Sequence, residues 1–230
     1  PMPEYPIEVL FEDNHLIVVN KRPGDIVQGD KTGDETLAEK VKQYIKEKYQ
    51  KPGEVFIGVV HRIDRPVSGA VIFARTSKSL TRMTNMFKSH DVHKTYWAIV
   101  KNQPPQDEDH LIHYLKKNEA QNKSYVYPAD TPETYRAELN YKVIGKSDTY
   151  YLLEVELLTG RHHQIRVQLA AIGCPIKGDL KYGFPRSNPG GSISLHSRRI
   201  EFIHPVKKES VIIIAQPPKD VVWDYFCSRQ

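Results

Sequence analysis

The stretch Tyr150-Tyr-Leu-Leu-Glu-Val-Glu-Leu-Leu158, with Thr159-Gly-Arg-His-His-Gln-Ile-Arg166 directly after it, decides the fold that the sequence predicts. Long apolar side chains alternate with two glutamates in the second half of the first segment, which is typical of a strand with one buried face. Residues 164–172 are predicted to form a helix, because Gly173 then supplies a good C-terminal cap. A strand therefore leads into a helix through a loop rich in Arg and His.

Further elements are predicted on both sides of this segment. Thr36 and Glu39 form a capping box that opens an amphipathic helix over 36–49, and Ser77 is the predicted cap of a second helix. Residues 102–133 are polar and contain several prolines, so we expect an excursion from the core there. Strands are predicted over 16–20, 55–63, 69–75, 95–100, 193–203 and 211–215.

Strands outnumber helices in this assignment and do not alternate regularly with them. This pattern favours an α+β fold with a mixed, mainly antiparallel sheet and flanking helices over a doubly wound fold. The chain has 230 residues, of which 39% are hydrophobic, enough to close a core. That length fits one large domain or two small ones.

Charge and composition narrow the class of protein. Lys and Arg number 33 against 28 Asp and Glu, a formal charge of +5, which suits a polyanionic partner without requiring one. The two cysteines, Cys174 and Cys227, form no CxxC pair, so neither a zinc site nor a redox pair is expected. No apolar stretch approaches the ~18 residues of a membrane span, and Pro1 to Phe11 lacks a secretory-signal layout. We expect a cytoplasmic protein.

One concentration of charged residues is His61-Arg-Ile-Asp-Arg-Pro-Val-Ser-Gly69. Asp64 lies between Arg62 and Arg65, and nearby positive charge keeps a carboxyl ionised. An ionised carboxylate can act as a nucleophile, and a proline and a glycine bracket the turn that carries it. The alternative is an Asp–Arg ion pair that closes a surface loop, and from this segment alone that alternative is favoured.

The loop after the strong strand is the second concentration. A row of Arg, His and Gln at a helix N-terminus suits phosphate or carboxylate. A metal site is disfavoured because adjacent residues such as His162 and His163 point in different directions on a helix. Residues 177–183 form a glycine-bounded loop that lacks the spacing of a phosphate-binding loop.

Six segments in a fixed order carry a resemblance to a known family. They are residues 16–24, 61–69, 94–98, 159–166, 173–183 and 195–205. Together they resemble the RluA-type pseudouridine synthases across nearly the whole chain. Val67 stands where that family usually has Thr, and Gln168 and Cys174 replace His. The motifs begin almost at once, so we expect a catalytic-domain-only member without the RNA-binding S4 module, a single domain over 1–230.

The resemblance implies an activity and a site. It implies the pseudouridine synthase fold with an RNA-binding cleft, and isomerisation of uridines in rRNA or tRNA without metal or cofactor. Asp64 would be the nucleophile, and Arg166 would pair with it. Tyr96 would stack on the target base and assist proton removal from C5. Arg62 would contact phosphate or fill the gap that the base leaves.

Other positions are assigned by their place beside the predicted cleft. Leu195, in the last motif, is assigned to substrate contact, while His61, His196 and His204 are interpreted as structural. We expect RNA as the partner, a monomer, and no membrane association. The candidates for RNA contact are Lys21, Arg22, Lys94, Arg161 and Lys181.

Two rival functions fit the sequence less well than a synthase does. A non-catalytic RNA-binding protein on the same scaffold would keep the basic cleft and lose the Asp64, Tyr96 and Arg166 set, which is present here. A metal-dependent nuclease needs clustered carboxylates, and a glycosidase needs a carboxylate pair. The motif around Asp64 holds no second acid, which suits neither hydrolase.

Overall fold

A computed structural model describes residues 7–230. The expectation about a secretory signal concerned Pro1 to Phe11, so its first six residues lie outside the described residues. The described chain divides into two compact units. Unit 1 comprises the chain up to Val92 together with Ser197–Gln216, and unit 2 comprises His93–His196 together with Pro217–Gln230. Each unit is built from segments far apart in sequence. A single domain over the whole chain stays a prediction.

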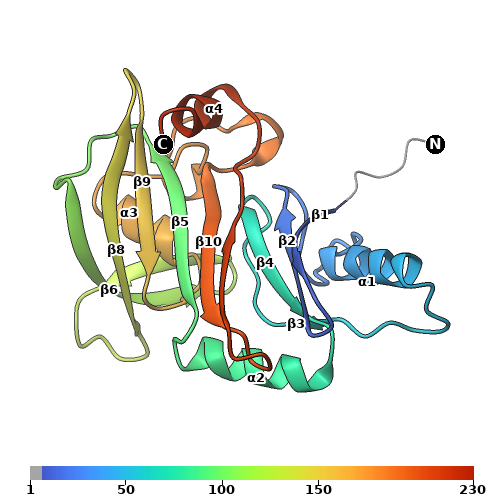
Figure 1. The fold of residues 1–230 in the computed structure, drawn as a ribbon. Helices are drawn as coiled ribbons and strands as arrows, with labels where there is room; N and C mark the ends of the chain where they lie inside the picture. Colours follow the sequence, from blue (N-terminus) through green and yellow to red (C-terminus); the bar gives the residue numbers. More distant parts are fainter. Residues whose placement is uncertain (1–6) are drawn as a thin grey trace. The chain divides into compact units, whose positions relative to one another are not determined.

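Unit 1 is a small sheet with two helices (Figure 1). Strand β2 lies between β1 and β4 and is antiparallel to both, while β3 adds two residues to β4 and β11 pairs with β10. Its elements are β1 Glu8–Glu12, β2 Leu16–Lys21, α1 Leu37–Lys48, β3 Gly58–Val59, β4 Ser68–Ala74, α2 Ser77–Lys88, most of β10 Leu195–Ile203, and β11 Ser210–Ile214.

The helices of unit 1 start where their caps place them. The capping box that opens α1 is confirmed, because Thr36 accepts from the Glu39 amide and Glu39 reaches back to the Thr36 amide. The predicted cap of α2 was wrong by one residue. Thr76 has extended backbone and its hydroxyl accepts from the Ser79 amide, so Ser77 is the first helical residue.

The core of unit 1 lies on both faces of β4, in which every residue is buried. On one face Val18 of β2 and Ile72 of β4 pack with Met83 of α2, all three fully buried. The opposite face of β2 carries Ile17 and Val19, which are also fully buried. Strands buried on both faces give the rigid base from which the loop before β4 projects.

Unit 2 is an antiparallel sheet in the order β5–β9–β8–β6–β7 (Figure 1). The strong strand and the following helix, from which the fold was predicted, are confirmed as β9 and α3. The elements of the unit are β5 His93–Val100, β6 Glu108–Asn118, β7 Lys123–Tyr127, β8 Tyr135–Lys146, β9 Tyr151–Leu157, α3 Gln164–Ala171, the 3-10 turns Leu180–Tyr182 and Pro189–Gly191, and α4 Val221–Cys227.

The two faces of this sheet are covered by different helices. Helix α3 packs on one face, where Val167 joins Ala137 of β8 and Leu115 of β6. Helix α4 packs on the other, where Trp223 and Phe226 meet aromatic and aliphatic side chains of β5 and β9. Because successive strand residues point to opposite faces, each strand residue can be assigned to the α3 face or to the α4 face.

Two predicted regions were wrong in detail, and two elements were missed. Only two residues of 55–63 form a strand, because β-rich composition does not make a strand without a ladder partner. The polar excursion over 102–133 contains β6 and β7, a hairpin whose polar residues face solvent. β8 and α4 were not predicted. The α+β class with a mainly antiparallel sheet is confirmed. Among residues 7–230, no helix combines the length and apolarity needed to cross a bilayer.

Candidate active site

Asp64 lies in the loop between β3 and β4, in a tight turn closed by a hydrogen bond from the Val67 amide to the Asp64 carbonyl at 3.0 Å. The next residue pins this turn to the end of β2. Its carbonyl, that of Arg65, accepts from the Gly24 amide at 2.8 Å and from Lys21 Nζ at 3.0 Å. A half-buried carboxylate therefore sits on a loop held at a fixed place over a buried strand.

The guanidinium of Arg65 turns toward the loop that follows β2. It donates to Asp30 at 2.9 Å and to Asp34 at 3.1 Å, and both partners are substantially exposed. These two ion pairs tie the Asp64 turn to the loop that follows β2.

Lys21 was expected to contact RNA, and the structure places it beneath the Asp64 loop instead. Its side chain is 1% exposed, and Nζ donates to the carbonyls of Arg22 at 2.9 Å and Arg65 at 3.0 Å. Burial lowers the pKa of Lys21 to about 7, against the opposing effect of the Asp64 charge. The ammonium braces the loop and sets a positive charge near Asp64, away from the surface.

This placement makes a pH-dependent prediction for Lys21→Met. A buried lysine whose pKa falls from 10.5 to about 7 binds fewer protons folded than unfolded between these values. Stability of the wild type should therefore rise across pH 7–10, with a slope of up to about 1.4 kcal/mol per pH unit. Urea denaturation should show Lys21→Met gaining relative to wild type most below pH 7 and least near pH 10. Parallel curves for the two proteins would contradict the assignment.

Two neighbours in the Asp64 motif differ in their contacts. Arg62 is exposed and makes no hydrogen bond or ion pair with any described residue, which leaves its guanidinium open to a ligand. His61 Nε2 accepts from the Ile72 amide at 2.9 Å, and its ring stacks on Phe87 at 4.6 Å. The structural interpretation of His61 is confirmed. His204 is likewise structural, buried with Nε2 on Asp13 at 2.8 Å.

Arg166 lies in the first turn of α3 and is 5% exposed. Its Nε and Nη2 donate to the two carboxylate oxygens of Asp179, each at 2.8 Å, and Asp179 is 1% exposed. The Arg166 guanidinium also lies 5.1 Å from the centre of the Tyr182 ring. A bidentate pair and an aromatic face thus fix the plane of this guanidinium.

Tyr182 links that pair to the rest of unit 2. Its hydroxyl accepts from the Ser124 amide on β7 at 2.9 Å and lies 2.7 Å from His163 Nδ1. Burial, with the charge of Arg166 next, lowers the pKa of His163 to about 2, so its imidazole is neutral and shares one hydrogen bond with the Tyr182 hydroxyl. His163 has φ 52° and stands directly before α3. The network therefore holds the loop-to-helix junction that aims Arg166.

Tyr96 lies in the middle of β5, opposite Val155 of β9, and is 8% exposed. Its neighbour Trp97 packs with α4, so Tyr96 and Lys94 belong to the α3 face, the face of Arg166. Lys94 Nζ lies 3.4 Å from the position a β-carbon would take on Gly160, and burial lowers the pKa of Lys94. The structure thus brings three predicted positions, Lys94 and Tyr96 on β5 and Arg166 on α3, to one face of unit 2.

Three further candidates fall in unit 2, while Arg22 is exposed directly after β2 in unit 1. Lys181 Nζ donates to the carbonyls of Asn122 at 2.9 Å and Gln121 at 3.4 Å, which ties it to the β6–β7 turn. Leu195 is 4% exposed at the start of β10, and Arg161 is exposed.

Asp179, Tyr182 and His163 were given no role from the sequence, although the motifs quoted above contain all three. Their contribution comes from contacts with Arg166 and Ser124 that only folding creates.

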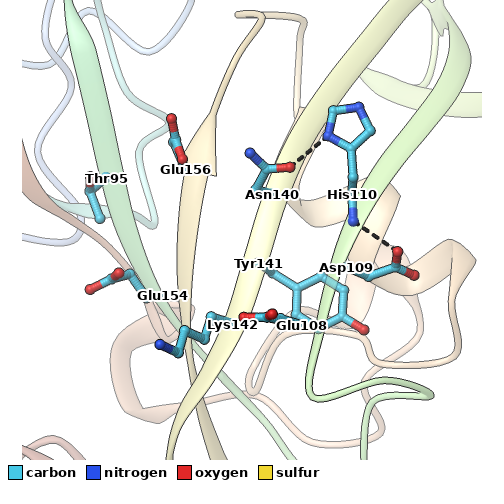
Figure 2. Close-up of a pocket in the computed structure, with 9 residues that line it drawn as sticks. All are labelled: Thr95, Glu108, Asp109, His110, Asn140, Tyr141, Lys142, Glu154 and Glu156. Carbon is cyan, nitrogen blue, oxygen red and sulfur yellow. Dashed lines mark hydrogen bonds between the residues drawn. The ribbon is translucent and has the colours of Figure 1, made fainter.

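A cavity of about 500 Å³ opens on the opposite face of the unit 2 sheet (Figure 2). Glu154 and Glu156 of β9 project into it beside Asn140 of β8, which contacts His110 Nδ1 at 2.6 Å. Carboxylates gathered on this wall repel phosphate. Within the described part of the chain, no group of three His, Cys, Asp or Glu side chains is arranged to hold a metal ion.

Comparisons with known proteins match most of the chain. The family model for RNA pseudouridylate synthase matches residues 15–171. Ribosomal large subunit pseudouridine synthase D of Zymomonas mobilis is 30% identical over 95% of this chain and 71% of its own length. tRNA pseudouridine synthase C of Vibrio cholerae is 28% identical over 97% and 95%.

A solved structure has a similar fold. Human RNA Pseudouridylate Synthase Domain Containing 4 superposes with a TM-score of 0.78 at 21% identity, covering 96% of this chain and 93% of that one. The predicted fold class is therefore confirmed. By the family match and its relatives, this chain belongs to the RNA pseudouridylate synthases, which are isomerases.

Proposed function

We propose that this protein isomerises uridine to pseudouridine in ribosomal or transfer RNA, with Asp64 as the nucleophile. The observation that carries the proposal is the Asp64 turn, pinned to β2 through the Arg65 carbonyl by Lys21 and Gly24. A nucleophilic carboxylate has to be held at one angle to the reacting sugar or base, and this turn supplies that constraint.

The reaction needs no redox or group-transfer partner. The N1–C1′ bond breaks, the uracil turns, a C5–C1′ bond forms, and the C5 proton leaves while N1 gains one. Since product and substrate have the same composition, the reaction consumes no co-substrate, and the activity is proposed to proceed without cofactor or metal. Tyr96 is proposed to stack on the uracil and to assist removal of the C5 proton.

Arg166 is proposed to hold the Asp64 carboxylate ionised and oriented, by a charge-assisted hydrogen bond. This pairing of Asp64 with Arg166 is proposed from the family motifs that contain the two residues. Within unit 2, the proposed role of Arg166 is supported by the fixed orientation of its guanidinium, which Asp179 and Tyr182 hold in one plane.

The RNA substrate is proposed from the names of the relatives, one of which acts on the ribosomal large subunit and another on tRNA. The target uridine has to leave its stack to reach Asp64, at a cost of a few kcal/mol. Single-stranded loops lower that cost, so we expect a loop or bulge as the target. The exposed, unpartnered Arg62 is proposed to contact phosphate or to fill the vacated position.

Release of tritium from RNA labelled at C5 of uridine tests the activity directly, with total RNA from cells that lack the gene as substrate. Wild-type protein should release label, and EDTA should leave the rate unchanged. Carbodiimide-dependent primer extension, with and without the gene, then maps the modified position. Protein that binds RNA and releases no label would support the non-catalytic alternative, and strong inhibition by EDTA would support a metal-dependent reaction.

A further inference from the structure

We infer that unit 2 carries a nucleotide-binding subsite beside the Thr159–Arg166 loop, which holds one nucleotide of single-stranded RNA outside the reacting uridine. Its base would stack on Tyr135, and its phosphate would lie between Arg161 and Lys117. This inference rests on the proposed function, since it takes RNA as the substrate.

The subsite is a cavity of about 340 Å³ between β6, β8 and the loop before α3. This volume lies in the range of about 300–1,000 Å³ that small-molecule sites occupy. One wall is Leu115 and Lys117 of β6, another is Tyr135 of β8, and the third is Arg161 with His162. An apolar floor, an aromatic wall and two cations give each part of a nucleotide a matching surface.

Tyr135 is the most informative of these residues. It is the first residue of β8 and 62% exposed, and its hydroxyl makes no hydrogen bond within residues 7–230. The Arg161 guanidinium lies 5.3 Å from the ring centre. A large ring at the edge of a cavity, with a cation on it and most of its surface in solvent, is a ready platform for a base.

Hydrogen bonds fix one edge of the Arg161 side chain, and the other edge makes none within the described residues. Its amide donates to Gln164 Oε1 at 3.0 Å, and Nε donates to the Arg136 carbonyl at 3.0 Å. Neither terminal nitrogen of the guanidinium has a partner among the described residues. An arginine whose direction is fixed while two donor groups stay open is preorganised for a phosphate.

Lys117 supplies the second cation. It pairs at 3.1 Å with Glu119, whose side chain is 82% exposed. Because such surface pairs contribute little, a phosphate can replace this carboxylate at low cost. Behind the two cations, His162 is held by Ser124 Oγ at 2.7 Å and Asn122 Oδ1 at 3.1 Å, so the wall is rigid before a ligand arrives.

The combination of features selects RNA over an acidic peptide. A carboxylate-rich peptide would satisfy the cations and leave the exposed ring without a partner. A nucleotide satisfies both, since every base has a stacking face whatever its sequence. The subsite should therefore recognise a nucleotide with little preference for its base.

The test measures RNA binding and turnover separately in the whole protein. The binding probe is a fluorescein-labelled, mixed-sequence single-stranded RNA, read by anisotropy, and turnover is tritium release at varied RNA concentration. Tyr135→Ala should raise Kd and KM by about 5- to 100-fold, with the loss in kcat/KM carried by KM. Tyr135→Phe should keep Kd and KM within about twofold of wild type, because the hydroxyl makes no hydrogen bond within residues 7–230.

Arg161→Gln should weaken RNA binding and reduce the slope of log K against log salt concentration by about 1.

Two matched variants control for general effects. Phe56→Ala removes an aromatic side chain that is 46% exposed, and Arg229→Gln removes an exposed arginine that lies 3.7 Å from a tyrosine ring centre. Neither residue lines the cavity, and both variants should bind RNA like wild type.

The outcomes separate this subsite from the proposed activity. If wild type releases tritium and Tyr135→Ala binds and turns over RNA as wild type does, the subsite is overturned and the activity stands. If wild type binds RNA, Tyr135→Ala binds it weakly and neither releases tritium, the subsite stands and the activity fails. Equal displacement of the RNA by a polyglutamate peptide would overturn the choice of ligand.

Discussion

Asp64→Asn is expected to abolish tritium release, by a factor of about 10⁴ or more, the scale on which removal of a catalytic carboxylate acts. Asparagine keeps the size of the side chain and removes its negative charge, so the nucleophile is lost. The turn itself is held through backbone groups and through Lys21, so the variant should unfold cooperatively like wild type. Single-turnover tritium release, with circular dichroism melting on the same sample, measures both effects.

A matched control comes from the same loop network. Asp34 pairs with Arg65 at 3.1 Å and its side chain is 56% exposed, so Asp34→Asn removes a carboxylate that contacts a residue of the turn. A surface ion pair contributes less than about 1 kcal/mol, and the control should lose less than about fivefold in rate. Equal release by Asp64→Asn and wild type would remove Asp64 from the chemistry.

Asp179→Asn is expected to have the largest effect on stability. It leaves the Arg166 guanidinium buried without its counter-charge, and breaking a buried pair costs about 3–5 kcal/mol. For a chain of this size that corresponds to a fall of roughly 6–20 °C in Tm. The exposed pair of Arg199 and Glu201 is the control, and Glu201→Gln should shift Tm by no more than a few degrees.

Activity separates the structural and catalytic roles of Arg166. Arg166→Met alone should lose activity severely, and it leaves the Asp179 carboxylate buried without its partner. In the double variant Arg166→Met with Asp179→Asn neither charge remains, so stability should recover toward wild type. If Arg166 acts in the site, the double variant stays inactive although it is stable at the assay temperature. Recovery of activity together with stability would limit Arg166 to a structural role.

Much of the fold could be predicted because its signals are local. The capping box at Thr36, the alternation in β9 and the glycine after α3 each depend on a few neighbouring residues. The regions that were mispredicted depend on distant partners. β6 is polar, and becomes a strand because it pairs with β8 on one side and β7 on the other.

The candidate site shows the same division. Asp64, Tyr96 and Arg166 are predicted by motif, because each stands at a fixed place in a short segment. The residues that position Asp64 and Arg166 were not predicted, because burial is a property of the folded chain. Lys21 looks like any loop-flanking lysine in sequence, yet it is 1% exposed, and Asp179 becomes a partner of Arg166 only when its turn folds against α3.

The acidic wall on the α4 face of unit 2 affects how RNA approaches. Carboxylates outnumber Lys142 on the side of the sheet that carries Glu154 and Glu156, while Lys94 and Arg161 lie on the other side. This separation gives the unit an electric dipole across its thickness, and the field of a polyanion exerts a torque on a dipole. RNA would thus meet unit 2 with its α3 side forward more often than chance, before any contact forms. Salt should weaken this orientation over a Debye length of about 8–10 Å, so productive encounters would become rarer as ionic strength rises.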